Sequence, residues 1–157
     1  MLKRLLSLAL WSILLFASLT SHAKEIQGNV IAVLDGDTII VLTSDNMQYR
    51  IRFDQIDAPE KSQAYGQVAK KYLSSLIYKR TVDVNIKDKD RYGRSIGEVF
   101  YKGENINLRM IQEGYAWAYQ KYVTDRTYLI AQEQAFKKRK GLWQTPNPTP
   151  PWEYRHK

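Results

Sequence analysis

Two short acidic segments are the first candidates for chemistry in this sequence. Asp35–Asp37 joins two apolar segments, and Asp57–Glu60 follows a third. Taken separately, each is typical of a turn, because Asp, Gly and Pro are residues that turns favour. If the second and third apolar segments form a hairpin, Asp37 and Asp57 lie at the same end of the sheet. Two carboxylates, completed by backbone carbonyl and water oxygens, can bind a hard divalent cation.

Two arginines and a glutamate supply the complementary groups. Arg52 alternates with apolar residues, so it projects from the face opposite the core, and Arg94 leaves a polar loop that could fold over the same end. Two guanidinium groups beside a cation would hold a phosphodiester and neutralise its transition-state charge. Glu60 is then placed to activate or orient a water for in-line attack. The alternative is a surface ion pair for each arginine and a solvated loop carboxylate for Glu60.

Aromatic residues are a further set of candidates for substrate contact. Tyr92, Tyr119 and Tyr122 could stack on bases, as aromatic side chains do in proteins that bind single strands. The sequence has eleven tyrosines, however, and ordinary packing explains most of them equally well. The segment Asp88–Gly93 begins like a calcium-binding EF-hand loop, but Tyr92 and Val99 occupy ligand positions. We therefore interpret it as a loop between strands.

The composition excludes most other hydrolytic chemistry. The 157 residues include no Cys and two His, which stand at positions 22 and 156. Cysteine nucleophiles, disulfide scaffolds, zinc centres and histidine-based triads are therefore excluded or nearly so. There are 24 Lys and Arg against 16 Asp and Glu, which gives a formal net charge of +8. This balance suggests an anionic partner such as nucleic acid, a phospholipid surface or an acidic polysaccharide.

The first 23 residues have the layout of a secretory signal peptide. Lys3 and Arg4 precede an apolar run from Leu5 to Leu19, and Ser21–Ala23 supplies small residues for signal peptidase. As a helix the run would be about 22 Å long, short of the roughly 30 Å core of a membrane. Cleavage after Ala23 would remove two basic residues and no acidic one, lowering the net charge from +8 to +6. We expect an exported protein, secreted or periplasmic, without stable membrane association after cleavage.

Hydrophobic periodicity places strands first and helices later. Alternation predicts five strands, at about residues 25–33, 39–42, 49–53, 80–87 and 96–101. A period near 3.6 predicts helices at about 65–79, 107–113 and 127–140, with Gly114 and Gly141 ending the last two. This order favours an α+β, mainly β fold, namely a five-stranded Greek-key OB-fold barrel with about three helices. We expect one domain at residues 24–143 and a Pro-rich tail, residues 144–157, that lies extended on the surface.

Four motifs, in order and spacing, resemble the staphylococcal nuclease (thermonuclease) family. They are Val33–Thr38, Arg52–Glu60, Asp90–Arg94 and Gly141–Trp143, and the resemblance extends from about Glu25 to Trp143. It implies a sugar-nonspecific phosphodiesterase that cuts DNA and RNA, prefers single-stranded regions and leaves 3′-phosphates. The segment from residue 60 to 66 is shorter than the family's active-site loop, so we expect turnover and substrate preference to differ.

The resemblance also implies roles for individual residues. Asp37 and Asp57 would bind Ca²⁺ together with the backbone carbonyl of Ala58, which stands where the best-known member has Thr. Glu60 would serve as general base. Arg52 and Arg94 would hold the scissile phosphate. The bound nucleotide would be contacted by Arg91, Tyr92, Tyr119 and Tyr122.

Two other functions compete with a monomeric, Ca²⁺-dependent nuclease. A non-catalytic OB-fold module would bind single-stranded nucleic acid or a protein. It predicts the loss of at least one of five site residues, but all are present: Asp37, Arg52, Asp57, Glu60 and Arg94. A protein that coats membranes or polysaccharide predicts an amphipathic basic helix. The one dense basic run, Lys137–Lys140, is typical of a solvated helix C-terminus.

Overall fold

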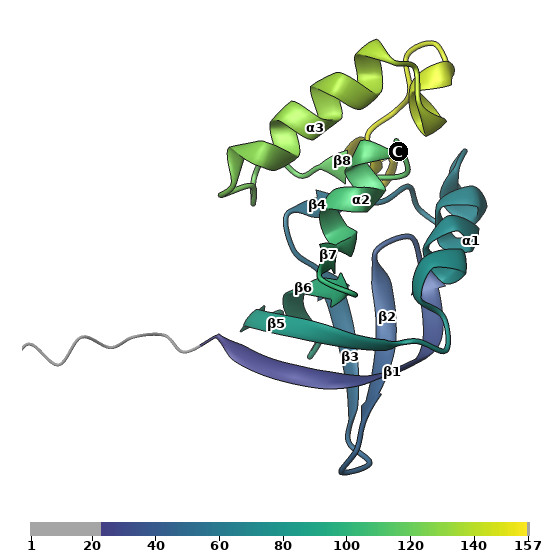
Figure 1. The fold of residues 1–157 in the computed structure, drawn as a ribbon. Coiled ribbons are helices and arrows are strands. Elements are labelled where there is room, and N and C mark those ends of the chain that lie inside the picture. The colour runs from purple at the N-terminus through teal and green to yellow at the C-terminus, as the bar shows by residue number, and fades with distance from the viewer. Residues whose placement is uncertain (1–22, 157) are drawn as a thin grey trace, which may run out of the picture.

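The computed structural model describes residues 23–156; the predicted signal peptide, apart from Ala23, lies outside the described residues. None of the helices formed by residues 23–156 is long and apolar enough to cross a membrane. Within this range the elements follow one another (Figure 1) as β1 (Lys24–Asp35), β2 (Thr38–Thr43), β3 (Gln48–Phe53), β4 (Ile56–Asp57), α1 (Gly66–Ile77), β5 (Thr81–Lys89), β6 (Ser95–Tyr101), β7 (Glu104–Asn105), α2 (Ile106–Gln112), β8 (Trp117–Ala118), α3 (Arg126–Lys137), the 3₁₀ helix η1 (Gly141–Gln144) and α4 (Pro151–Tyr154).

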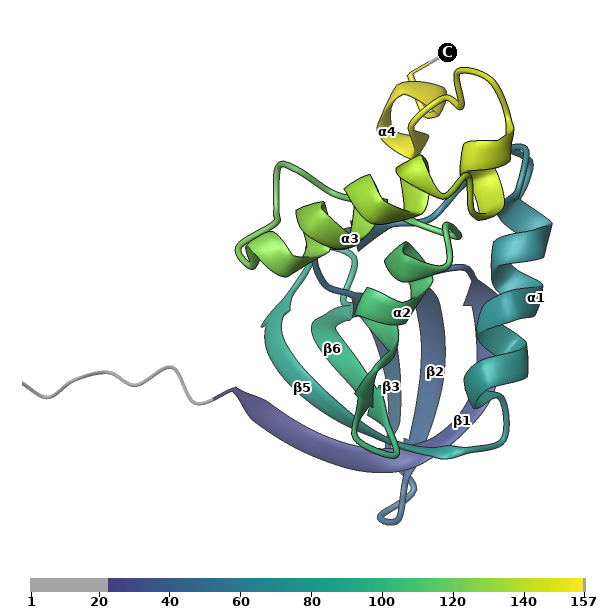
Figure 2. The same cartoon turned by 45° about the horizontal axis from the view of Figure 1, so that its top comes forward.

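Five strands close into a barrel. β1 pairs antiparallel with β2 and with β5, β2 pairs with β3, and β5 pairs with β6. The parallel pairing of Ile51–Phe53 in β3 with Ser95–Gly97 in β6 closes the ring. Figure 2 shows α1 along one side of the barrel and α2 between the barrel and α3. The predicted α+β, mainly β, OB-fold barrel is confirmed.

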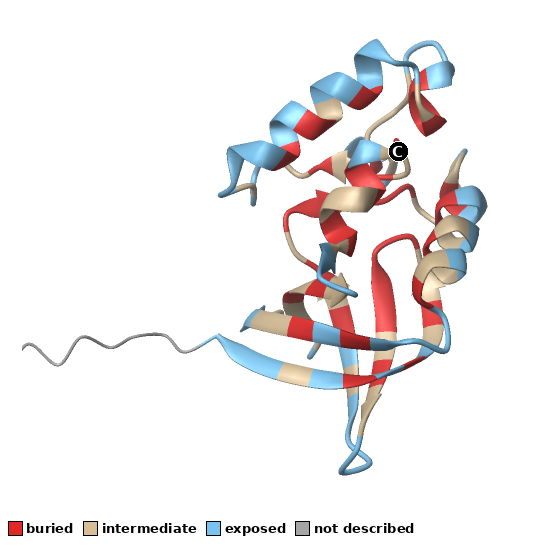
Figure 3. Ribbon diagram, viewed as in Figure 1, coloured by how far each residue is buried: buried red, intermediate tan, exposed pale blue. Residues whose placement is uncertain are grey.

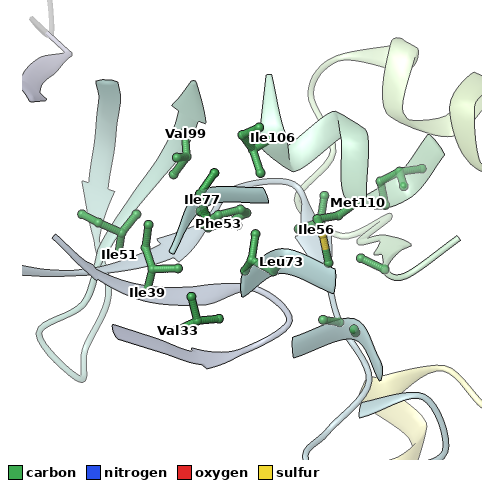
Figure 4. Close-up of a cluster of buried hydrophobic side chains, with 14 of the residues drawn as sticks. Val33, Ile39, Ile51, Phe53, Ile56, Leu73, Ile77, Val99, Ile106 and Met110 are labelled. Atoms are coloured by element: carbon green, nitrogen blue, oxygen red, sulfur yellow. The ribbon is translucent and has the colours of Figure 1, made fainter. Parts of the chain in front are cut away.

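The core fills the barrel and the space beneath the helices. Buried residues alternate with exposed ones along β1 and β5 (Figure 3), which is the period of a strand with one apolar face. In α1 the predicted spacing of four residues buries Ala69, Leu73 and Ile77. Burying each large apolar side chain contributes about 1.5–3 kcal/mol. Figure 4 shows the side chains that meet here, among them Ile39, Ile51, Phe53, Leu73, Ile77, Val99, Ile106 and Met110.

Asn107 is a buried polar link between α2 and the barrel. Its side chain is fully buried, and its Oδ1 accepts a hydrogen bond from the Val99 N–H at 3.0 Å. Its Nδ2 donates to the carbonyls of Asp54 at 3.0 Å and Gly97 at 3.1 Å. All three partners are backbone groups of the segments that meet where the barrel closes. Asn107 therefore fixes the turn after β3 relative to β6.

The two predicted helix-ending glycines have different roles. Gly114 follows α2 with a φ of 75°, and the N–H of Tyr115 returns to the Met110 carbonyl, as expected for a helix C-terminus. The prediction that α3 continues to Gly141 is wrong, because α3 ends at Lys137 and Arg139 adopts the left-handed conformation instead. A Cβ on Gly141 would lie 2.2 Å from the Gly114 carbonyl oxygen. Gly141 therefore permits close contact between two loops.

The prediction that the tail lies extended is also wrong. Pro151 is buried and starts the one-turn helix α4, because a proline at the first helical position needs no N–H partner. The Trp152 ring stacks on Tyr119, with centroids 5.3 Å apart and planes 2° apart. The Gln63 side chain donates to the Thr149 carbonyl at 2.6 Å. The tail thus folds back onto the domain (Figure 2).

Candidate active site

The turn between β1 and β2 holds Asp37 in a buried position. Asp35 Oδ1 accepts a hydrogen bond from the Asp37 N–H at 3.1 Å, which closes the turn locally. A Cβ on Gly36 would lie 2.7 Å from the Cβ of Ala58 and 2.8 Å from that of Ala69, so only glycine lets the turn approach α1 so closely. Asp37 Oδ2 accepts from the Ala58 N–H at 2.7 Å. The two acidic segments of the sequence are therefore in direct contact.

Arg52 brings the two aspartates to one place. Its Nη2 lies 3.3 Å from Asp37 Oδ2 and 3.0 Å from Asp57 Oδ1. Its Nη1 donates to the carbonyls of Phe53 at 2.6 Å and Ile56 at 2.9 Å, which ties the guanidinium to the turn that carries Asp57. Asp57 was predicted to lie at the end of the third strand. The turn instead separates it from β3 and places it in β4, opposite Trp117 of β8. The expected convergence of Asp37 and Asp57 is present.

Asp37 and Asp57 are buried carboxylates that lie close together beside Arg52. Burial raises the pKa of Asp57, and the charge of Asp37 acts in the same direction, against a hydrogen bond from Arg155 and the charge of Arg52. Burial and the neighbouring Asp37 also raise the pKa of Asp35 to about 7. Adjacent buried carboxylates repel one another, and a bound cation relieves that repulsion. The electrostatics of this turn therefore favour a cation.

The donors present fit a hard cation held partly by backbone. Among residues 23–156, no three Asp, Glu, His or Cys side chains form a group that could hold a metal by themselves. A site here must therefore combine the two aspartates with backbone and water oxygens, and the contact between Asp37 and the Ala58 N–H puts that residue's backbone beside the carboxylates. Carboxylate and carbonyl oxygens are the ligands that Ca²⁺ takes.

Glu60 reaches the same place through a residue that the sequence analysis did not select. Arg155 Nη1 lies 2.6 Å from Glu60 Oε1 and 3.2 Å from Asp57 Oδ1, while Nη2 lies 2.8 Å from Asp57 Oδ2. The Gln63 side chain accepts from the Glu60 N–H at 3.0 Å. In the predicted short loop, a Cβ on Gly66 would lie 1.9 Å from the Glu60 carbonyl oxygen, so the loop is tightly folded.

Arg94 lies in a separate, exposed basic loop between β5 and β6. Its Nε is 2.6 Å from Asp90 Oδ2, and the N–H groups of Arg94 and Tyr92 both donate to Asp90 Oδ1 at 2.9 Å. The guanidinium groups of Arg91 and Arg94 lie 5.0 and 5.7 Å from the centre of the Tyr92 ring, which is 70% exposed. Ile96 of β6 pairs with Arg52 of β3 where the barrel closes. Arg94 precedes Ile96 by two residues, so its backbone lies near the end of β3 that carries Arg52. The loop therefore brings together three residues predicted to contact the substrate, Arg91, Tyr92 and Arg94. None of the contacts described above joins this loop to Asp37 or Asp57.

Tyr119 and Tyr122 lie next to one another, and the tail covers one of them. Their ring centroids are 4.8 Å apart at an interplanar angle of 80°. Tyr122 is exposed, whereas Tyr119 is stacked against Trp152. The buried side chain of Gln55 anchors this loop, because its Oε1 accepts from the N–H groups of Thr124 and Asp125, both at 2.8 Å. The sequence analysis missed Gln55, because nothing in the sequence distinguishes it from a residue of an ordinary turn.

Known proteins share much of this sequence. A family model described as "Staphylococcal nuclease homologue" matches residues 50–145. The chain belongs to the staphylococcal nuclease family. An "Uncharacterized endonuclease" of Haemophilus influenzae is 45% identical over 144 residues, which cover 91% of this chain and 81% of the relative. A "Micrococcal nuclease" of Shigella flexneri is 40% identical over 155 residues, which cover 92% and 88%.

Membership of the staphylococcal nuclease family confirms the resemblance seen in the four sequence motifs. A further relative, an "Uncharacterized endonuclease" of Escherichia coli O157:H7, is 43% identical over 134 residues, or 85% of this chain and 87% of the relative. The family and the names of these relatives support a nuclease, that is, a hydrolase with nucleic acid as its substrate. Arg155 lies beyond the residues that the family model matches.

Proposed function

We propose that this protein is an exported, Ca²⁺-dependent nuclease that hydrolyses phosphodiester bonds of DNA and RNA, with single-stranded regions preferred. The observation that carries the proposal is the position of Arg52, whose guanidinium lies between two buried aspartates. A guanidinium held this rigidly beside acidic groups is suited to binding a phosphate whose negative charge a second cation shares. Neither group alone would hold a phosphodiester next to two carboxylates.

The residues divide into cation ligands and groups that act on the substrate. Asp37, Asp57 and the Ala58 carbonyl would hold Ca²⁺: the family resemblance suggests all three, and the proximity of the two carboxylates, each beside Arg52, supports the aspartates. When bound, the cation would neutralise charge on the phosphate and make its phosphorus more susceptible to attack. Arg52 would hold a non-bridging oxygen of the scissile phosphate, and Arg94 would hold another by approaching from its loop.

Glu60 is the candidate general base. Its side chain is partly exposed at the edge of the acidic site, where water can reach it. Glu60 would accept a proton from a water as the water oxygen forms a bond to phosphorus, and the bond from phosphorus to the 5′ oxygen would break in line. The departing oxygen takes up a proton, so the products are a 3′-phosphate and a 5′-hydroxyl. Arg91 and Tyr92 would contact the nucleotide, and Tyr122 would offer a stacking surface.

A digestion assay on purified residues 24–157 tests the proposal. The protein should degrade single-stranded DNA and RNA with Ca²⁺, stop when a chelator is added and resume when Ca²⁺ is restored. We expect Glu60→Gln to lower turnover by about 10²–10⁴-fold, the range for a lost general base, and Arg94→Ala to abolish most activity. Glu25→Gln removes one exposed carboxylate from β1 and should leave activity unchanged.

Binding without cleavage would favour the alternative, a non-catalytic nucleic-acid module. Affinity for nucleic acid should fall steeply with salt under either hypothesis, so affinity does not discriminate between them. A wild-type protein that binds DNA but cuts neither DNA nor RNA with any divalent cation would refute the nuclease proposal. The names of the relatives make cleavage the expected outcome.

Export and oligomeric state form the last part of the proposal. The arrangement of Lys3, Arg4 and the apolar run after them supports cleavage after Ala23 and release into the periplasm or the medium, and we propose that the released protein is a monomer. The mature protein recovered outside the cytoplasm should begin at Lys24, as N-terminal sequencing or intact mass would show. Size-exclusion chromatography with light scattering should give the mass of a single chain.

A further inference from the structure

We propose that the C-terminal tail is an autoinhibitory clasp in which Arg155 occupies the carboxylates of the divalent-cation site, so that cation binding and tail docking exclude one another. The inference rests on the proposed function, because it assigns Asp57 and its neighbours to a cation. It goes further by giving the tail, which from residue 146 onward lies beyond the residues that the family model matches, a specific role in regulating that site.

Two arginines occupy both carboxylate oxygens of Asp57. Arg155 Nη1 and Nη2 engage Oδ1 and Oδ2 of Asp57 at 3.2 and 2.8 Å, while Arg52 takes Oδ1 at 3.0 Å. Both carboxylate oxygens of a side chain that is only 2% exposed are therefore already paired with cationic nitrogen. A divalent cation needs these oxygens within about 2.3–2.6 Å. A cation that takes both oxygens would have to displace the two-point contact of Arg155 with Asp57.

The Arg155 guanidinium also engages Glu60. Arg155 Nη1 lies 2.6 Å from Glu60 Oε1, so one side chain pairs with a candidate metal ligand and with the candidate general base. Arg155 is the more exposed partner of Asp57, with 37% of its side chain accessible, against 14% for Arg52. Of the two arginines on Asp57, Arg155 is therefore the one that can leave without unfolding the barrel.

The rest of the tail docks beside the site. Trp152 stacks on Tyr119 and contacts Trp117 edge-on, with centroids 5.7 Å apart. The hydroxyl groups of Tyr154 and Ser62 lie 3.1 Å apart. The Trp152 ring covers a tyrosine that the sequence analysis proposed for nucleotide contact, in the flat geometry that a base would adopt. The docked tail therefore covers both the cation carboxylates and a candidate base-stacking surface.

Calcium titration of the full mature chain by isothermal calorimetry tests the competition. Arg155→Gln should bind Ca²⁺ roughly tenfold more tightly or better than wild type, because the cation no longer has to displace a charge-assisted, two-point contact. Arg126→Gln removes the same charge from the exposed start of α3 and should bind Ca²⁺ like wild type. Arg155→Lys keeps the charge but loses the paired contact, so its affinity should lie between the two.

Hydrogen exchange of the tail gives a readout independent of activity. The N–H groups of Tyr154 and Arg155 donate within α4, to the carbonyls of Pro150 and Pro151. Because coupling between two binding events is reciprocal, Ca²⁺ should speed exchange at these amides in the wild type. In Arg155→Gln, exchange there should already be fast without Ca²⁺, while α1 stays protected in both proteins.

The possible outcomes separate this inference from the proposed function. Equal Ca²⁺ affinity in wild type and Arg155→Gln, or tail amides that stay protected when Ca²⁺ is bound, would overturn the clasp and leave the nuclease proposal intact. Absence of Ca²⁺ binding in both proteins would overturn the cation site, and the clasp with it. Loss of Ca²⁺ binding in Asp57→Asn, together with tighter binding in Arg155→Gln, would establish both.

Discussion

Replacing Asn107 with alanine should destabilise the protein by about 2–6 kcal/mol. The substitution removes the partner of the Val99 N–H and of the Asp54 carbonyl, whereas the Gly97 carbonyl still accepts from the Asp54 N–H at 2.8 Å. A buried polar group without a partner destabilises the fold by about 1–3 kcal/mol, and two such groups remain. Domains of this size unfold with about 5–15 kcal/mol, so this one side chain controls a substantial fraction of the stability.

Asn107→Asp sharpens the prediction, because it preserves shape while reversing polarity. The aspartate could still accept from Val99, but its second oxygen would face the two carbonyls to which Asn107 donates at 3.0 and 3.1 Å. We expect a loss at least as large as for alanine at neutral pH. The loss should shrink as the pH falls, since burial raises the pKa of such a carboxyl and its protonated form can donate.

Urea unfolding, followed by tryptophan fluorescence, measures the stability loss of both Asn107 variants. The loss is read from the shift of the urea midpoint, provided that the dependence of the unfolding free energy on urea concentration is unchanged. The matched controls Asn29→Ala and Asn29→Asp change an exposed residue of β1 and should stay within about 0.5 kcal/mol of wild type. A loss below about 1 kcal/mol for Asn107→Ala would refute the argument that the three backbone groups depend on this side chain.

Two further predictions concern other parts of the fold. Gly36→Ala should destabilise the protein by about 1–3 kcal/mol through overpacking against α1, and it should reduce nuclease activity by displacing Asp37. Gly103→Ala is the control: a Cβ there meets nothing within 4 Å, but φ is +79°, so the melting temperature should fall only through backbone strain. Burial and the charge of Glu98 raise the pKa of Tyr128, so its stabilising effect is complete below the usual tyrosine pKa and declines above about pH 10. The stability difference between wild type and Tyr128→Phe, measured by urea unfolding at pH 7 and pH 11, should therefore narrow at the higher pH, and a constant difference would contradict this assignment.

Local pattern predicted those features that depend on residues near one another in sequence. The alternation around Arg52 placed it correctly on the face opposite Ile51 and Phe53, because side chains in a strand alternate whatever the rest of the chain does. The helical period near 3.6 predicted α1 for the same reason. The contact between the two acidic segments followed from hairpin geometry, which is also local.

The errors and omissions arise where distant parts of the chain meet. Arg139, two residues beyond the end of α3, adopts a conformation that favours glycine, and the loop after it brings Gly141 against Gly114. A single asparagine within a helix has the pattern of a surface residue, and only the packing of α2 against the closed barrel buries Asn107, so the sequence gives no signal for it. The tail was expected to be extended because prolines prevent regular structure, but one of them begins a helix. The position of Arg155 depends on packing between residues almost a hundred positions apart.

The parallel pairing that closes the barrel also determines when a functional site can exist. It joins residues 51–53 to residues 95–97, so a long loop must close before it forms, and such contacts are slow to form in folding. Two hydrogen bonds hold the turn that carries Asp57: the Asp54 N–H donates to the Gly97 carbonyl, and the Asn107 side chain donates to the Asp54 carbonyl. Gly97 and Asn107 both belong to the later part of the chain. A partly synthesised chain already contains the acidic residues and Arg52 but lacks the later segments that hold the Asp57 turn against β6. Nuclease activity should therefore appear only with complete folding, which would protect the nucleic acids of a producing cell while the chain is still being made.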